Sequence, residues 1–75
     1  MLGMDRDSAT LKFGERVRSA RDAAGWTQED LAHATGLAVV QISRIERGVR
    51  EVRLTTILRL VEALGVEPNE LLVRD

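Results

Sequence analysis

The sequence contains no cysteine and a single histidine, His33. A disulfide framework is therefore excluded, and one imidazole cannot build a metal cage by itself. His33 has no nucleophile at a useful spacing, and no glycine loop that could cradle a phosphate is present. We therefore expect no enzyme, no metal, no cofactor and no small-molecule ligand, and we expect His33 to be an exposed or half-buried helix residue.

Long apolar runs are also missing. The longest, residues 37–40, is far shorter than the about 20 residues that span a bilayer. Residues 1–10 carry Asp5, Arg6 and Asp7 where a signal peptide needs an apolar core, and Gly3 is displaced from the position that myristoylation requires. These absences predict a cytoplasmic protein that has no contact with a membrane.

Charge of one sign is not in excess. The formal net charge is −1, whereas strong nucleic-acid binders are usually basic overall. The charges are unevenly placed, however, because basic residues dominate segments 12–21 and 39–53 and acidic residues dominate the C-terminal stretch. A basic face with an acidic far side suits a DNA-binding protein that dimerises through its other end; the alternative is that the charges only solvate helix surfaces.

Helical periodicity is what the sequence has in abundance, without β-alternation or internal repeats. We predict an all-α fold of five short helices. Ser8 or Thr10 would cap the first helix, and Gly25 would end it. Its apolar face would consist of Phe13, Val17, Ala20 and Ala24.

The next two helices lie between Thr27 and Gly36 and between Ala38 and Gly48. Thr27 and Asp30 have the spacing of a capping box, and Leu31 and Ala34 would face inward. A strongly amphipathic helix follows and ends at Gly65, and Pro68 opens a short last helix. One core is predicted to contain Leu31, Ile42, Ile45, Leu54, Ile57, Leu58, Val61 and Leu64.

The segment TQEDLAHATGLAVVQISRIE, residues 27–46, fits two helices that cross at about 90–120° through a tight turn. Ala32 is small enough for the backbones to approach, and Gly36 tolerates the positive φ of the turn. The crossing angle would be locked by Leu31, Leu37, Ile42 and Ile45. Either Val40 or Val39 belongs to the core, or both valines press on thymine methyl groups in the DNA major groove.

These residues resemble the Cro and phage-repressor (XRE-type) helix-turn-helix family. The resemblance runs from Phe13 to Leu72 and is carried by FGERVRSARDAAGWTQEDLA, TGLAVVQISRIERG and LTTILRLVEALGVEPNELL. It implies a compact five-helix domain of the lambda-repressor-like type, in which the second and third helices form the helix-turn-helix. The chain is most similar to controller proteins of restriction–modification systems, although prophage repressors and antitoxins share most of these features.

The resemblance also implies roles for single residues. Base-reading positions of the family match Val39, Val40, Gln41, Ser43 and Arg44, of which Gln41 could pair with adenine and Arg44 with guanine. Phosphate-contacting positions match Thr27, Gln28, Arg47 and Arg50. Arg21 and Glu46 match a largely buried ion pair, so we assign Arg21 to the structure and not to DNA. Ala38 and Arg53 depart from the family, which places capping residues there.

The C-terminal end carries more apolar surface than one short helix can bury. We therefore predict a symmetric homodimer whose interface contains Val52, Val66, Pro68, Leu71, Leu72 and Val73. Residues 10–75 would form the DNA-binding domain with its dimerisation helix, after a tail of residues 1–9. The dimer would regulate transcription by binding an inverted repeat in double-stranded DNA, with RNA polymerase as a further candidate partner. The alternative is an antitoxin-like or assembly-only module, whose binding would respond weakly to salt.

Overall fold

We describe residues 6–72 of a computed structural model of the chain, in which every regular element is an α-helix. The helices are α1 (Arg6–Ala23), α2 (Gln28–Thr35), α3 (Val39–Arg47), α4 (Leu54–Leu64) and α5 (Pro68–Leu71). The prediction of an all-α fold of five helices is confirmed. No described helix combines the length and the apolarity needed to cross a membrane.

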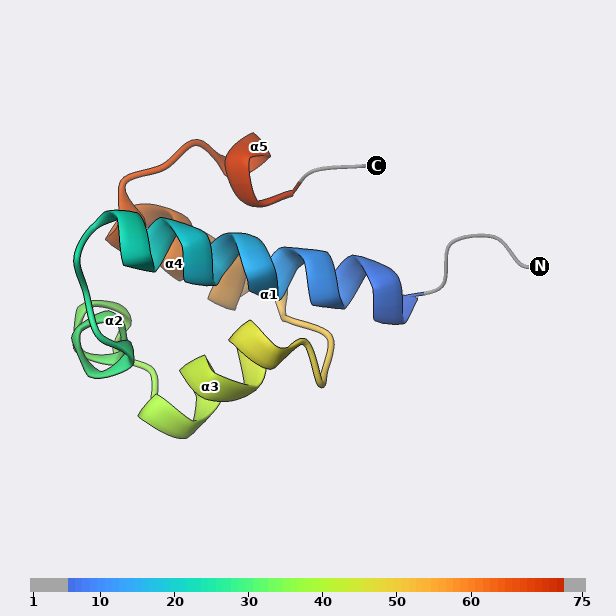
Figure 1. Cartoon of the computed structure of the whole chain (residues 1–75), viewed down its shortest axis with the longest axis horizontal. Helices are drawn as coiled ribbons and strands as arrows, with labels where there is room; N and C mark the ends of the chain where they lie inside the picture. Colours follow the sequence, from blue (N-terminus) through green and yellow to red (C-terminus); the bar gives the residue numbers. More distant parts are fainter. Residues whose placement is uncertain (1–5, 73–75) are drawn as a thin grey trace.

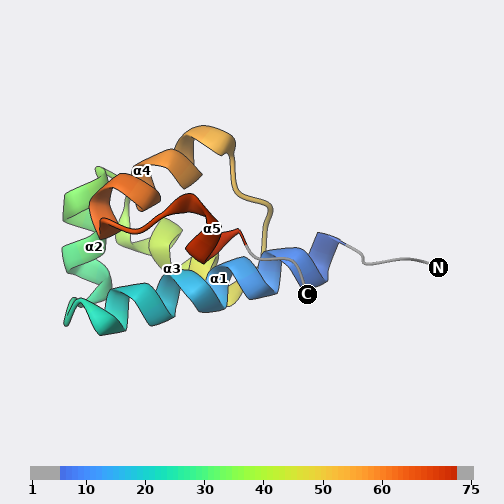
Figure 2. The same ribbon diagram turned by 90° about the horizontal axis from the view of Figure 1, so that it is seen from above.

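α1 runs along the length of the domain, and in Figure 1 α3 lies below it and α5 above it. α1 packs mainly against α3, and α2 packs against both α3 and α4. The view from above shows α1 and α4 along opposite edges of the domain, with α3 and α5 between them (Figure 2). The helix-turn-helix therefore forms one end of the domain, and α5 caps the opposite one.

The core draws one fully buried side chain from each helix. These side chains are Val17, Leu31, Ile42, Leu60 and Leu71. Phe13 and Ile45 complete the buried cluster, and Ile57, Val61 and Leu64 pack against it while half-buried. A chain this short has few fully buried side chains, so a smaller residue at any of these five positions should lower the stability of the fold substantially.

The prediction for α4 was wrong at two positions, because Leu54 is 69% exposed and Leu58 is 52% exposed. Leu60, which the prediction omitted, is the residue of this helix that is fully buried. Seven of the eleven residues of α4 are apolar, so its hydrophobic arc is wider than the surface that the core can cover. Leu54 and Leu58 lie on the uncovered side of that arc.

Smaller corrections concern the first two helices. α1 begins at Arg6, so Ser8 and Thr10 lie inside it and do not cap it; no glycine or proline interrupts the helix there. Ala24 follows the last residue of α1 and is exposed. Ala34 is also exposed, because α2 turns Leu31, Ala32 and Thr35 inward instead.

The predicted dimer residues need a correction as well. Leu71 is 2% exposed within the protomer, so it has almost no surface to offer to a second copy. Leu72 is 51% exposed, Pro68 is exposed, and Val52 and Val66 are half-buried against the core. Val73 lies outside the described residues.

Gly14 sets the distance between α1 and α3, a role that was not predicted from the sequence. A Cβ atom at this position would overlap the carbonyl oxygen of Ile45 and lie 2.7 Å from that of Glu46. A glycine in the middle of a helix lowers helix propensity, and its presence there is the signal that could have indicated a close backbone approach.

Gly14→Ala should therefore destabilise the domain by about 1–3 kcal/mol, because α3 must move away from α1. The sign of this change in stability identifies close packing, since a Gly→Ala exchange at a helix position without packed neighbours stabilises a protein by about 0.5–1 kcal/mol. Urea unfolding followed by circular dichroism measures the difference, with Ser19→Ala on the exposed side of α1 as the control. A Gly14→Ala variant as stable as the parent chain would contradict the close packing.

Candidate nucleic-acid interface

α2 begins with a complete capping box. The Thr27 hydroxyl accepts the backbone N–H of Asp30 at 3.0 Å, and the Asp30 carboxylate accepts the backbone N–H of Thr27 at 2.8 Å. The predicted capping box is thus confirmed. The Thr27 hydroxyl acts as an acceptor in its bond to the Asp30 N–H, so its own proton is available for donation to a ligand such as a phosphate.

The turn between α2 and α3 is held by Thr35 and Gly36. Gly36 has φ 78° and ends α2 in the left-handed conformation, as predicted. The buried hydroxyl of Thr35 donates to the carbonyl of Leu31 at 2.8 Å and accepts the N–H of Leu37 at 3.2 Å. Thr35 is not among the residues predicted from the sequence, although a threonine beside a turn glycine often bonds the backbone of the preceding helical turn.

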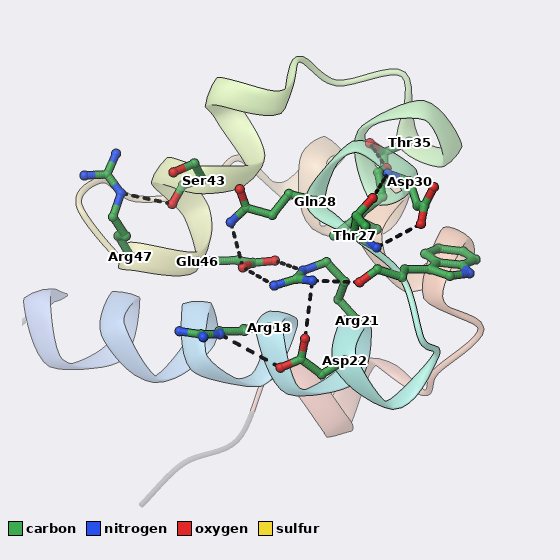
Figure 3. Close-up of polar contacts among 12 residues, drawn as sticks. Arg18, Arg21, Asp22, Thr27, Gln28, Asp30, Thr35, Ser43, Glu46 and Arg47 are labelled. Atoms are coloured by element: carbon green, nitrogen blue, oxygen red, sulfur yellow. Dashed lines mark hydrogen bonds and ion pairs between the residues drawn. The ribbon is translucent and has the colours of Figure 1, made fainter.

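A buried ion pair joins α1 to α3. Arg21 donates to both carboxylate oxygens of Glu46, from Nε at 2.7 Å and from Nη2 at 3.1 Å (Figure 3). The two side chains are 11% and 3% exposed. The structure therefore places the Arg21 side chain inside the protein, paired with Glu46.

Two more groups bind to this pair, in addition to the exposed Asp22, whose carboxylate lies 3.3 Å from Arg21 Nη1. The carbonyl of Trp26, in the turn between α1 and α2, accepts Arg21 Nη1 at 2.7 Å, and Gln28 Nε2 of α2 donates to Glu46 Oε1 at 3.1 Å. We call Arg21, Trp26, Gln28 and Glu46 the ion-pair network. It contacts α1, α2, α3 and the turn between the first two, so it fixes the helix-turn-helix as one rigid unit.

The network also fixes the charge of Arg21. The hydrogen bonds to Glu46 raise the pKa of the Arg21 guanidinium above its ordinary value; burial acts in the opposite direction, and the charges of Glu46 and Asp22 add to the increase. Gln28 is half-buried and uses its side-chain donor within the network. A phosphate contact at Gln28 would therefore rely on its backbone N–H at the start of α2.

The outer face of α3 is open to solvent. Val39 is 40% exposed and Val40 is 51% exposed, so neither valine belongs to the core. Gln41 and Arg44 are exposed beside them, and Ser43 is half-buried. Ala38 forms no side-chain bond at the start of α3, in keeping with the departure noted in the sequence. This face contains all five residues predicted to read bases.

Cations surround that face. Gln41, Arg44, Arg50 and Arg53 line one open hollow between α3 and the loop that follows it. Arg47 is exposed, and its Nε reaches the carbonyl of Ser43 at 3.4 Å. Segment 39–53 carries four arginines, and Glu51 is its one exposed acid because Glu46 is buried against Arg21. The exposed net charge of segment 39–53 is therefore 4 − 1 = +3, which is larger than a count that treats Glu46 as exposed would give.

His33 is exposed on α2. Within residues 6–72, no three histidine, aspartate or glutamate side chains lie together in a way that could hold a metal ion.

The fold and this geometry define a helix-turn-helix protein. A helix-turn-helix family model matches residues 17–71, and the chain belongs to that family. It is 44% identical over 63 residues to the control protein C.BamHI of Bacillus amyloliquefaciens, covering 83% of this chain and 78% of that protein. It also spans 24% of the length of an uncharacterized HTH-type transcriptional regulator of Mycobacterium tuberculosis, at 35% identity over 66 residues, which are 88% of this chain.

Solved structures agree with the family assignment. The restriction-modification controller protein C.AhdI of Aeromonas hydrophila superposes with a TM-score of 0.82 at 45% identity, over 85% of this chain and 97% of that one. The clp gene regulator ClgR of C. glutamicum superposes with a TM-score of 0.81 at 30% identity, over 85% of this chain and 83% of that one.

Glu46→Ala should destabilise the domain by about 3–5 kcal/mol, because it removes the buried partner of Arg21 and leaves only the exposed carboxylate of Asp22, 3.3 Å from Nη1, beside that charge. Arg18→Ala on the same helix should cost under about 1 kcal/mol, since the Arg18–Asp22 pair is exposed. The double variant Arg21→Met/Glu46→Leu should recover much of the loss, because no charge remains stranded. Urea unfolding at low temperature measures all three, and equal costs for Glu46→Ala and Arg18→Ala would contradict the network.

Proposed function

We propose that this chain is a sequence-specific DNA-binding transcriptional regulator that reads the major groove with α3. The main support for this proposal is the set of side chains on the outer face of α3. It presents exposed valines, an amide and an arginine, has a local charge of +3 around it, and is rigidly held from behind by the ion-pair network. Apolar contacts suit thymine methyl groups, amide and guanidinium groups suit base edges, and the surrounding arginines suit phosphates.

The family comparisons support a finer version of this proposal. Both C.BamHI and C.AhdI are named as control or controller proteins, and each aligns with most of the chain. We therefore propose a restriction–modification controller role in the cytoplasm, with double-stranded DNA as the principal partner and RNA polymerase as a candidate second one.

A homodimer is the form in which we expect the chain to bind DNA. Leu54 and Leu58 are one helical turn apart on α4 and are exposed, and so is Leu72 after α5. Leu72, Val52 and Ile57 also line an open apolar hollow against the N-terminal half of α1. We call Leu54, Leu58, Leu72, Val52 and Ile57 the α4–α5 surface. Two-fold symmetry would bring two such surfaces together and would bury leucines that a monomer leaves in water.

The dimer has a geometric consequence for the DNA site. Because α3 lies at the opposite end of the domain from α5 (Figure 1), a dimer formed through the α4–α5 surface leaves both α3 faces outward. Two α3 helices separated by about 34 Å would enter successive major grooves. The operator should then be an inverted repeat whose half-sites are about 10 base pairs apart.

The base and phosphate roles of the arginines can be separated by one experiment. Bound sequences are selected from a random DNA pool, and affinities for single base changes are then measured at several salt concentrations. Arg44→Ala should reduce discrimination at one base pair by about 1–3 kcal/mol, because a guanine contact is lost. Arg50→Ala should weaken all sequences alike and reduce the salt slope by about 1, as loss of a phosphate contact does.

Two results would contradict these assignments. Equal effects of Arg44→Ala and Arg50→Ala on every sequence would make Arg44 a phosphate contact. The assembly-only alternative would be favoured if the selection enriched no DNA sequence and if the chain instead bound protein partners with an affinity that salt hardly changes.

The dimer makes a separate prediction. Leu58→Glu should shift the chain from dimer to monomer in sedimentation equilibrium, because paired carboxylates would be buried at the two-fold interface. Leu11→Glu is the matched control, since Leu11 is 48% exposed on α1 and lies against Gly48, outside the α4–α5 surface. Circular dichroism should show both variants folded. A Leu58→Glu variant that remained dimeric would place the interface elsewhere.

A further inference from the structure

Arg53 occupies a position at which an arginine lowers the stability of the fold. It is the N-cap residue of α4 and forms no side-chain hydrogen bond there, so the first backbone N–H groups of the helix gain no side-chain acceptor. Its positive charge also lies at the positive end of the α4 dipole, where a negative side chain is favoured. Both effects weaken the start of α4.

The charge of Arg53 has no partner in the described part of the chain. Arg44 of α3, Arg50 of the following loop and Arg53 are exposed and line one hollow. Within residues 6–72, none of these three guanidinium groups forms an ion pair, although Glu51 lines the same hollow. Like charges around one hollow repel one another, so an anion bound in it would relieve that repulsion.

Other arginines of the domain are bonded within the protein. Arg21 and Arg18 pair with carboxylates, and Arg47 and Arg59 donate to backbone carbonyl oxygens. On the α3 wall of the hollow, Gln41 Oε1 accepts a backbone N–H at the start of α3 at 3.1 Å. The three arginines of the hollow differ from these side chains, because their guanidinium groups remain available to a ligand.

We propose that Arg53 binds a phosphate of the DNA backbone beside the base pairs that α3 reads, and that it does so at a cost to the stability of the free chain. This inference rests on the proposed function of α3. The hollow adjoins the base-reading face, because Gln41 and Arg44 belong to both. A strand whose bases meet that face carries its phosphates alongside, and guanidinium groups bind phosphate oxygens with strong, charge-assisted hydrogen bonds.

Removal of Arg53 should therefore change stability and DNA affinity in opposite directions. Arg53→Ser supplies an N-cap acceptor and removes a repelling charge, so the melting temperature of the DNA-free chain should rise by about 4–8 °C in circular dichroism. The affinity for the selected duplex should fall about tenfold at low salt, the factor expected for the loss of one charged hydrogen bond. A residue with only a structural role would change both quantities in the same direction.

Arg53→Gln tests the charge alone, and Arg16→Gln is its matched control. Arg16 is exposed on α1 and lines a different hollow, together with Glu70 of α5. Both variants lose one positive charge, but only Arg53→Gln should reduce the slope of log affinity against log salt concentration, by about 1. Arg53→Gln should also weaken all DNA sequences alike, since phosphates carry no direct sequence information.

The contacted phosphate is located with duplexes in which single phosphates are replaced by neutral methylphosphonates. On one of these duplexes, the wild-type and Arg53→Gln chains should bind equally well, because the interaction has already been removed from the DNA side. We expect that phosphate to lie beside the base pair whose discrimination Arg44→Ala reduces.

Several results would overturn the proposal. Unchanged affinity and salt slope in Arg53→Gln, with a wild-type chain that selects a DNA site, would refute this inference and leave the proposed function standing. A wild-type chain that selects no DNA site would refute both. A loss confined to one base pair would make Arg53 a base contact. If inorganic phosphate raised the melting temperature of the wild-type chain more than that of Arg53→Gln, while both chains bound DNA equally, the hollow would hold a free phosphate instead.

Discussion

The buried contact between Arg21 and Glu46 is the interaction on which the rest of this structure depends. A bidentate guanidinium–carboxylate pair has one favourable geometry, unlike an apolar contact, which tolerates sliding and rotation. Glu46 is on α3, Arg21 is on α1, and the pair also holds the Trp26 carbonyl and the Gln28 amide. The orientation of α3 about its own axis is therefore set by directional bonds, and the network determines which residues face outward.

Packing sets the distance between α1 and α3. Gly14 lets the two backbones touch, and Ile42 and Ile45 of α3 are buried in the core on the same side. Base readout requires side chains to be placed with sub-ångström accuracy, so a helix that is fixed in both rotation and distance is suited to it. The same network removes Glu46 from the exposed charge of α3 and so strengthens the field that a phosphate backbone would meet.

Much of the fold could be predicted from the sequence, because its signals are local. The helix-ending glycines, the Thr27 capping box and the inward Ile42 and Ile45 are read from neighbouring residues alone. The rotation of α4 could not be predicted, since its apolar residues surround most of the helix and only tertiary packing selects Leu60 over Leu54 and Leu58. The bonds of Gln28 and Gln41 were equally hidden, because an amide can donate or accept and the partner it finds depends on what the fold places nearby.

The central claim, that the outer face of α3 is the surface that meets DNA, is tested most directly by nuclear magnetic resonance of the ¹⁵N-labelled chain. The chain is titrated with its selected duplex, and the backbone amide shifts are followed residue by residue. The account predicts that the largest changes cluster at the start of α2, around Thr27 and Gln28, and along α3 from Val39 to Arg44. Changes concentrated on α4 and α5, with α3 unaffected by DNA, would contradict it.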